Sequence, residues 1–155
     1  MKNSIKELEN ILNYSFKNSE LLKQSLIHKS FNKDNNNEKL EFLGDRVLGL
    51  IISKKLIEIY PEEKEGIIDK KYANLVNKKT CSSIAKKLNL KKYMFLGASQ
   101  KSALVSTNKI MSDCLEALIG AIFLDSGLKS AEKFIFIFWK KFLADSVLTL
   151  IDAKT

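Results

Sequence analysis

The sequence is poor in proline and glycine, the residues that form the turns of β-rich folds. It contains one proline, Pro61, and six glycines in 155 residues, whereas the many turns of a sandwich or barrel depend on both. No run of about 18 apolar residues occurs, so no segment is predicted to cross a bilayer. The N-terminal residues also lack the apolar stretch of a signal peptide. These absences favour a helical protein that is neither secreted nor embedded in a membrane.

Cysteine and histidine are equally scarce. Cys81 and Cys114 stand far apart, in segments with helical spacing and without a metal-ligand partner nearby. We therefore expect buried, reduced thiols in a cytoplasmic protein. The one histidine, His28, is interpreted as a buried structural hydrogen-bonding residue beside a loop and not as a catalytic base.

The charge is strongly basic. Lysine and arginine together number 26 against 18 acidic residues, which gives a net charge of +8. This excess suits a polyanionic partner, but it suits simple solubility as well. Arg46 is the single arginine, and lysine neutralises phosphate without the arginine fork that reads base edges. If the partner is a nucleic acid, recognition of its backbone and shape is favoured over recognition of its sequence.

Apolar residues recur at helical intervals along nearly the whole chain, which predicts an all-α fold of one domain. Near the N-terminus, Ser4 and Glu7 are typical of a capping box. The aromatic run from Phe134 to Trp139 is expected in the core. Polar connections are expected at 32–37 and 97–107. The other helices are predicted at residues 19–28, 38–60, 67–76, 79–88, 108–124 and 130–143.

Acidic residues interrupt the apolar pattern of the helix expected at 38–60. Glu38, Glu41 and Asp45 are spaced at i, i+3 and i+7, which places them on one helix face, with the last two about 6 Å apart. Because most other positions of this segment are apolar, a solvated acidic face would expose large hydrophobic residues. The carboxylates are therefore predicted to lie where water is scarce. Gly44 indicates either a close helix contact or room for a ligand.

The helix expected at 108–124 has the same anomaly, because Asp113 and Glu116 stand at i, i+3 among apolar and small residues. If the two helices pack with these faces together, four carboxylates converge and a cation must offset their repulsion. Oxygen ligands without His or Cys suit Mg²⁺ or Mn²⁺ better than zinc. Such a site can align a water molecule and polarise a phosphoryl oxygen. The alternative is that acids such as Glu41 and Asp113 pair with lysines along a buried helix seam.

Two segments resemble the signatures of the ribonuclease III family. Residues 37–48, NEKLEFLGDRVL, are similar to the family's N-E-R-L-E-F-L-G-D-[SRA]-V-L. Residues 113–125, DCLEALIGAIFLD, are similar to its D-x-x-E-A-x-x-G-A-[IV]-[YF]-L-D. The resemblance runs in order from about Leu21 to Trp139, and it is supported by the segments His28-Lys29-Ser30, Glu65-Gly66 and Ala73-Asn74-Leu75-Val76.

The resemblance implies an all-helical endonuclease domain that acts as a homodimer on double-stranded RNA. It implies Mg²⁺ as cofactor, with Mn²⁺ as a substitute, and neither a small-molecule cofactor nor a membrane. Metal-assisted hydrolysis would give 5′-phosphate and 3′-hydroxyl ends with short 3′ overhangs, in the processing of rRNA precursors, mRNA and small RNAs.

The resemblance also assigns roles to individual residues. Asp45 and Glu116 would be the most critical for catalysis, and Phe42 would contact the partner subunit. Glu38 and Glu65 would be further catalytic acids that act less directly. The metal ligands would be Glu41, Asp45, Asp113 and Glu116.

The sequence departs from the family pattern in three places. Arg46 and Ser112 replace a commoner serine and alanine, and residues 101–105 lack a usual glycine pair. Residues 1–148 are predicted to form the endonuclease domain. Residues 149–155 look like the start of a linker to a double-stranded RNA-binding domain that is absent from the sequence.

Two rival functions differ from the nuclease in testable ways. A non-catalytic RNA-binding or ribosome-associated domain on the same fold would have lost acids, whereas all six matched acidic positions are present. A small-molecule phosphohydrolase would turn over nucleotides without dimerising, and the twelve-residue signature argues against it. In the nuclease interpretation, duplex shape guides binding, and Lys71 and Lys109, each near a motif, are candidates for phosphate contacts.

Overall fold

The computed structural model describes residues 2–101 and 107–154, and these residues form helices joined by short connections. The predicted all-α fold is confirmed, and within the described ranges the sole extended pairing is a single parallel bridge between Ile27 and Phe95. The helices are α1 (Lys2–Leu12), α2 (Ser19–Ser25), α3 (Glu38–Ile59), α4 (Glu65–Val76), α5 (Lys78–Lys87), the 3₁₀ helix η1 (Leu90–Tyr93), α6 (Ala98–Lys101), α7 (Thr107–Ser126) and α8 (Leu128–Lys154).

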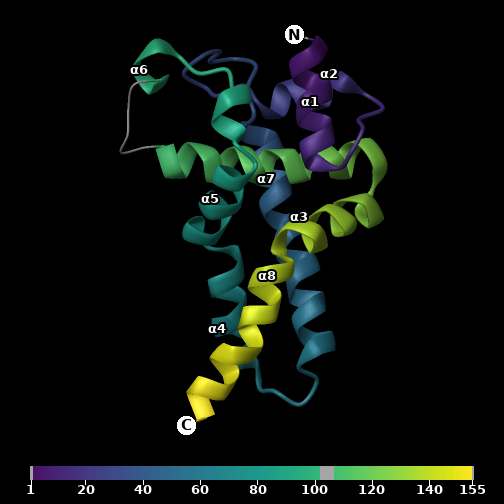
Figure 1. Cartoon of the computed structure of the whole chain (residues 1–155), viewed down its shortest axis with the longest axis vertical. Helices are drawn as coiled ribbons and strands as arrows, with labels where there is room; N and C mark the ends of the chain where they lie inside the picture. Colours follow the sequence, from purple (N-terminus) through teal and green to yellow (C-terminus); the bar gives the residue numbers. More distant parts are fainter. Residues whose placement is uncertain (1, 102–106, 155) are drawn as a thin grey trace.

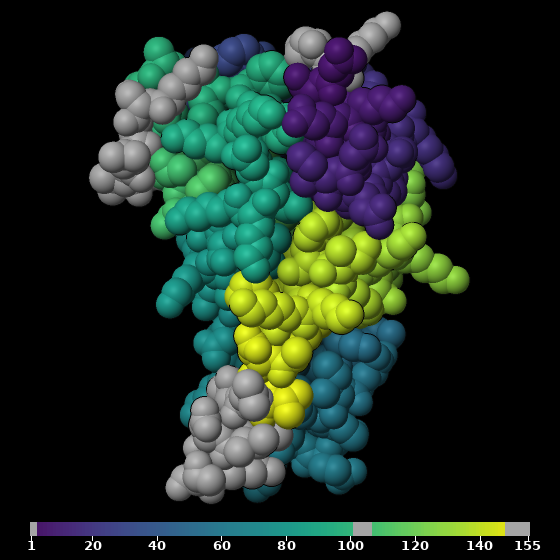
Figure 2. Space-filling model, viewed as in Figure 1, coloured from purple at the N-terminus to yellow at the C-terminus, as the bar shows by residue number. Residues whose placement is uncertain are grey.

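Helices α3 and α7 are the centre of the molecule. Helix α3 runs along the long axis, and α7 crosses it (Figure 1). Every residue from Ile110 to Ile122 is buried, including two acids, because α7 is apolar on nearly all sides and other helices surround it. Helix α8 packs between α3 and α4 in the lower half of the view (Figure 2). Among the residues that the structure describes, no helix has the length and apolar character needed to cross a membrane.

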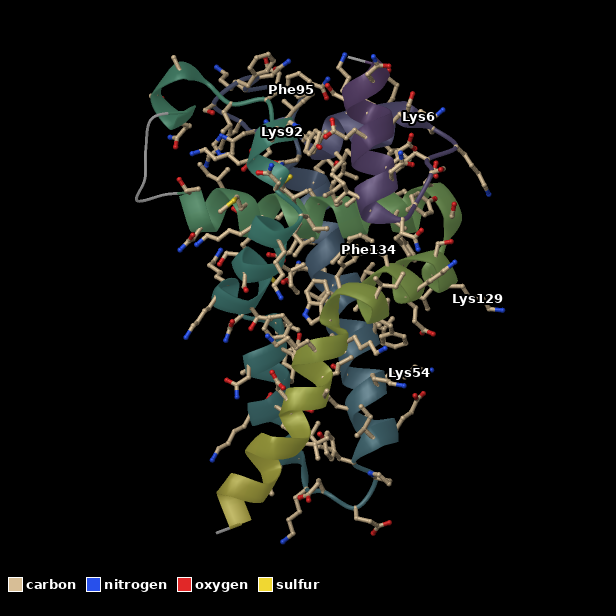
Figure 3. The ribbon with its side chains drawn as sticks, in the orientation of Figure 1. Lys6, Lys54, Lys92, Phe95, Lys129 and Phe134 are labelled. Carbon is tan, nitrogen blue, oxygen red and sulfur yellow. The ribbon has the colours of Figure 1, made fainter. Side chains whose placement is uncertain are left out.

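The predicted aromatic core is confirmed for Phe134 and Trp139, whereas Phe136 and Phe138 are half-buried at its edge. Trp139 is fully buried, and its Nε1 donates to the Leu75 carbonyl oxygen at 2.8 Å. Phe134 is also buried and points into the interior (Figure 3), where its ring contacts that of Phe138. Both cysteines are free and buried, as the sequence predicts.

Several predicted helix ends need correction. The capping box is wrong, because α1 begins at Lys2 and Ser4 lies inside the helix. Helix α2 ends at Ser25 and not near residue 28, because the next residues turn to form the bridge to Phe95, whose N–H donates to the Leu26 carbonyl. Helix α3 ends before Pro61, in agreement with the prediction.

The C-terminal helix is longer than predicted. We expected it at 130–143, but α8 continues through Lys154 and so includes residues assigned from sequence to a linker. The division of the chain into an endonuclease domain (1–148) and the start of a linker (149–155) remains a prediction. The connection expected at 97–107 contains the short helix α6, and residues 102–106, with most of the altered glycine-pair region, lie outside the described residues.

Candidate metal centre

Two glycines set the distance between α3 and α7. A Cβ atom added to Gly44 would come within 1.6 Å of the Glu116 carbonyl oxygen, and one added to Gly120 would come within 2.2 Å of the Leu40 carbonyl oxygen. No side chain fits at either position, so the two helix backbones are in direct contact. The close-contact interpretation of Gly44 is therefore confirmed.

This crossing brings the four predicted carboxylates together as two pairs. Glu41 faces Asp113, and Asp45 faces Glu116, closely enough that Asp113 contributes to the raised pKa of the Glu41 carboxyl and Asp45 to that of the Glu116 carboxyl. Two carboxylates in such proximity repel each other, which favours the protonated form of the more buried acid. The structure thus joins an α3 acid to an α7 acid twice, at adjacent turns of both helices.

Burial decides which acids hold protons. Glu116 is only 9% exposed, and this burial, together with the Asp45 carboxyl, raises its pKa to about 8. Burial and then the Asp113 charge raise the pKa of Glu41 to about 7. Asp45, by contrast, has a side chain that is 61% exposed. A divalent cation could take the place of these protons, because both neutralise the same crowded charge.

Two neighbouring cavities give access to the carboxyl pairs. The larger, of about 450 Å³, is lined by residues that include Glu41, Asp45 and Glu116. The smaller, of about 260 Å³, is lined by residues that include Glu41 and Asp113. Glu38 lines both cavities, so it lies with the predicted cluster although its side chain is exposed.

Basic side chains surround the acids. Lys109 Nζ lies 2.7 Å from Asp113 Oδ2, and Lys78 Nζ lies 3.5 Å from Asp113 Oδ1. Asp113 therefore forms ion pairs with two lysines, as the alternative interpretation of the sequence predicts, within the same site as the other acids. Lys78 was not singled out from sequence, because it is one lysine among many and only the tertiary fold brings it to α7.

The donor chemistry of the site fits a hard divalent cation. Its four acids offer only oxygen, which is the preference of Mg²⁺ and Mn²⁺. Within residues 2–101 and 107–154, no three His, Cys, Asp or Glu side chains already stand in a metal-coordinating arrangement. The pKa values of Glu41 and Glu116 are raised, so a cation bound by these acids would have to displace their protons.

The remaining predicted residues lie in different places. Phe42 is 61% exposed, and the Arg46 guanidinium carbon lies 3.6 Å from the centre of its ring. Glu65 begins α4, whose opposite end borders the larger cavity, and twelve helical residues span roughly 18 Å, so Glu65 lies away from the other acids.

Two further predictions are changed by the structure. Lys71 is only 3% exposed and donates to the Ser146 carbonyl oxygen, so its prediction as a phosphate contact is wrong. His28 is half-buried and not fully buried. Its Nδ1 accepts a hydrogen bond from the Ser30 N–H at 3.1 Å, which confirms a hydrogen-bonding role next to the loop.

The fold and the site together define an all-helical domain that brings carboxyl groups from its two central helices together where these helices cross. The profile of the Ribonuclease-III-like family matches residues 18–145. The chain is 54% identical over 155 residues to Ribonuclease 3 of Pelagibacter ubique, and it covers 70% of that protein. It is 43% identical over 153 residues to Ribonuclease 3 of Ehrlichia ruminantium (96% of this chain and 67% of that protein).

A solved structure agrees with these relatives. The nuclease domain of ribonuclease III from Campylobacter jejuni superposes with a TM-score of 0.85 at 40% identity, over 88% of this chain and 96% of that one. A region of that Campylobacter domain is involved in dimer formation. The chain belongs to the ribonuclease III family.

Proposed function

We propose that the chain is the nuclease domain of an endoribonuclease that hydrolyses phosphodiester bonds in double-stranded RNA and depends on Mg²⁺, with Mn²⁺ as a substitute. The observation that carries this proposal is the meeting of Glu41 with Asp113 and of Asp45 with Glu116 in adjoining cavities. Membership in the ribonuclease III family supports it.

In this proposal the four paired acids hold the cation. Glu116 and Glu41 must lose protons to do so, and Asp45, the most exposed of the four, faces the side from which substrate arrives. When bound, the cation supplies Lewis acidity and lowers the pKa of water. The products would be 5′-phosphate and 3′-hydroxyl ends with short 3′ overhangs.

The substrate proposal rests on membership in the ribonuclease III family, and the positive charge agrees with it. An excess of lysine over a single arginine suits phosphate contacts and the shape of A-form duplex, without reading of base edges. Substrates would then be structured regions of rRNA precursors, mRNA and small RNAs, in the cytoplasm, with no small-molecule cofactor. Lys109 remains a candidate for a phosphate contact because it borders the smaller cavity.

The proposed homodimer rests on the outer face of α3. Phe42, Leu50 and Ile57 are each about 60% exposed, and a row of large apolar side chains on one helix is typical of a subunit contact. Such a face is covered in a symmetric dimer by the same face of the second copy. Phe42 would then be a dimer contact, as the family resemblance implies.

The proposed dimer also explains how Glu65 could act in catalysis although it lies far from the acids of its own chain. Because Glu65 lies far from the acids of its own chain, we propose that it assists catalysis in the partner's site. Mixed dimers of Glu65→Gln with Glu116→Gln test this arrangement. If Glu65 acts across the interface, one of the two sites in the mixed dimer is intact and nicks one RNA strand. If it acts within its own chain, both sites carry a defect and no such nicking activity returns.

The direct test of function is cleavage of a long RNA duplex in Mg²⁺ at low salt. The wild type should produce short duplexes, and Glu116→Gln should lose cleavage by at least about a thousandfold. Glu58→Gln, on the exposed end of α3, is the matched control and should cleave like the wild type. RNA binding in Ca²⁺ without cleavage in Mg²⁺ by the wild type would instead favour a non-catalytic RNA-binding domain.

A further inference from the structure

Both carboxylate oxygens of Asp113 are occupied by ammonium groups. Lys109 Nζ donates to Oδ2 at 2.7 Å and Lys78 Nζ donates to Oδ1 at 3.5 Å. The Asp113 side chain is only 11% exposed, whereas both lysine side chains are more than 60% exposed. The acid is thus fixed inside the protein, and its two cationic partners can move into solvent.

The two lysines approach Asp113 from different cavities. Lys78 is the first residue of α5 and lines the larger cavity together with Glu41, Asp45 and Glu116. Lys109 lies one turn before Asp113 on α7 and lines the smaller cavity. Lys78 is therefore the ammonium group that stands where the other three acids converge, and its contact with Asp113 is the longer of the two.

We propose that Lys78 occupies the Asp113 oxygen that a divalent cation takes, and that the displaced ammonium group then binds a phosphate oxygen of the RNA in the same cavity. Lys109 keeps the second oxygen and holds the Asp113 side chain in position. The proposal rests on the proposed function, since it assigns a substrate-binding role within the same site.

Electrostatics gives the reason for the exchange. Without a cation, Lys78 offsets part of the repulsion among the acids, so the site can fold with its carboxylates close together. A divalent cation at Asp113 Oδ1 repels the ammonium group and also replaces it as the neutralising charge. The start of α5 keeps the Lys78 backbone at the edge of the cavity, so the released side chain remains within reach of a bound phosphate.

The test compares Lys78→Gln and Lys109→Gln with a matched control. Lys54→Gln removes a lysine that also stands four residues before its acidic partner, Glu58, at 2.8 Å, but on an exposed surface away from the site. Figure 3 shows Lys54 pointing outward from α3. Mn²⁺ binding is measured by electron paramagnetic resonance, and duplex RNA binding is measured by fluorescence anisotropy in Ca²⁺ over a range of salt concentrations.

We expect Lys78→Gln to bind Mn²⁺ roughly three- to tenfold more tightly than the wild type, because a competing charge is removed. The same variant should bind RNA several-fold more weakly, with the salt slope reduced by about one. Lys109→Gln should also tighten Mn²⁺ binding, and because Lys109 stays on Asp113 in this proposal, it should weaken RNA binding less than Lys78→Gln does. Lys54→Gln should change neither.

The proposal is overturned if Lys78→Gln leaves Mn²⁺ binding unchanged, or if its RNA affinity equals that of Lys54→Gln. A purely structural role for Lys78 would lower the melting temperature of the variant without either change, and this result also overturns the proposal. Lys78→Arg retains the charge and should keep wild-type RNA affinity, which separates charge loss from misfolding. If wild type and Glu116→Gln bind Mn²⁺ equally, the proposed function itself fails.

Discussion

Gly44 on α3 lies so close to Glu116 on α7 that a single added carbon atom would come 1.6 Å from the Glu116 carbonyl oxygen. The helix that carries Glu41 and Asp45 is therefore pressed against the backbone of the helix that carries Asp113 and Glu116. Any group that separates the helices also separates both carboxyl pairs. The glycine is thus a requirement of the site as well as of the core.

Replacing Gly44 with alanine should destabilise the protein by roughly 2–4 kcal/mol, because two backbones must move apart. The measurement is urea-induced unfolding followed by circular dichroism. Gly66→Ala is the control, since the added carbon at this helical position meets nothing within 4 Å. This control should be neutral or stabilised by up to about 1 kcal/mol. Equal stability of the two variants would contradict the close contact.

The raised pKa of Glu116 makes a prediction about pH. Its pKa is about 8 in the folded chain and about 4.5 when unperturbed, so between these values the folded state holds a proton that the unfolded state has released. Without divalent cations, the free energy of unfolding should therefore fall as pH rises from about 4.5 to about 8 and then level off.

Glu116→Gln should abolish the slope between about pH 7 and 8, while part of the slope below about pH 7 remains because the pKa of Glu41 is also raised. The variant should be more stable than the wild type near pH 8, by about 1–3 kcal/mol. Urea unfolding at several pH values in a chelating buffer measures both effects. Addition of Mn²⁺ near pH 8 should stabilise the wild type and leave the variant almost unchanged. Parallel pH profiles for the two proteins would refute the assignment of the proton to Glu116.

The exposed ring of Phe42 predicts the behaviour of the dimer. Phe42→Ala should raise the dissociation constant of the homodimer at least about tenfold, because a large aromatic contact is lost. Sedimentation equilibrium measures the constant directly. Phe31→Ala removes an aromatic side chain of similar exposure, 56%, that packs against Phe95, and it should leave the dimer intact. Equal effects of the two substitutions would argue against α3 as the interface.

Ser112 offers a stability prediction inside the site helix. Its side chain is fully buried, and among the described residues its Oγ has no oxygen or nitrogen partner, while the Cys81 thiol lies beside it. Ser112→Ala should therefore stabilise the protein by about 1 kcal/mol, because a buried hydroxyl without a good partner is removed. Thermal unfolding measures this change, and a lower melting temperature would show that the hydroxyl is satisfied.

The sequence alone was enough to predict the helices that matter and the acids they carry. Glu41 and Asp45, like Asp113 and Glu116, are spaced by one helical turn, and local spacing determines which residues share a helix face. The apolar surroundings of these acids predicted poor solvation, and burial of Asp113 and Glu116 on α7 confirms it. On α3 the same prediction is wrong for Glu38 and Asp45, which are exposed, because this helix also exposes large apolar side chains such as Phe42. Their roles as metal ligands remain a prediction.

Only the tertiary structure decided which acid of α3 lies against which acid of α7, and which lysine contacts them. Lys78 reaches Asp113 and Lys71 is buried against α8, although both are lysines in one basic stretch of sequence. The end of α2 likewise depends on a bridge to the distant Phe95. Local spacing fixes positions along one helix, whereas pairing, burial and protonation depend on how separate helices cross, and here the crossing is set by backbone contact at two glycines.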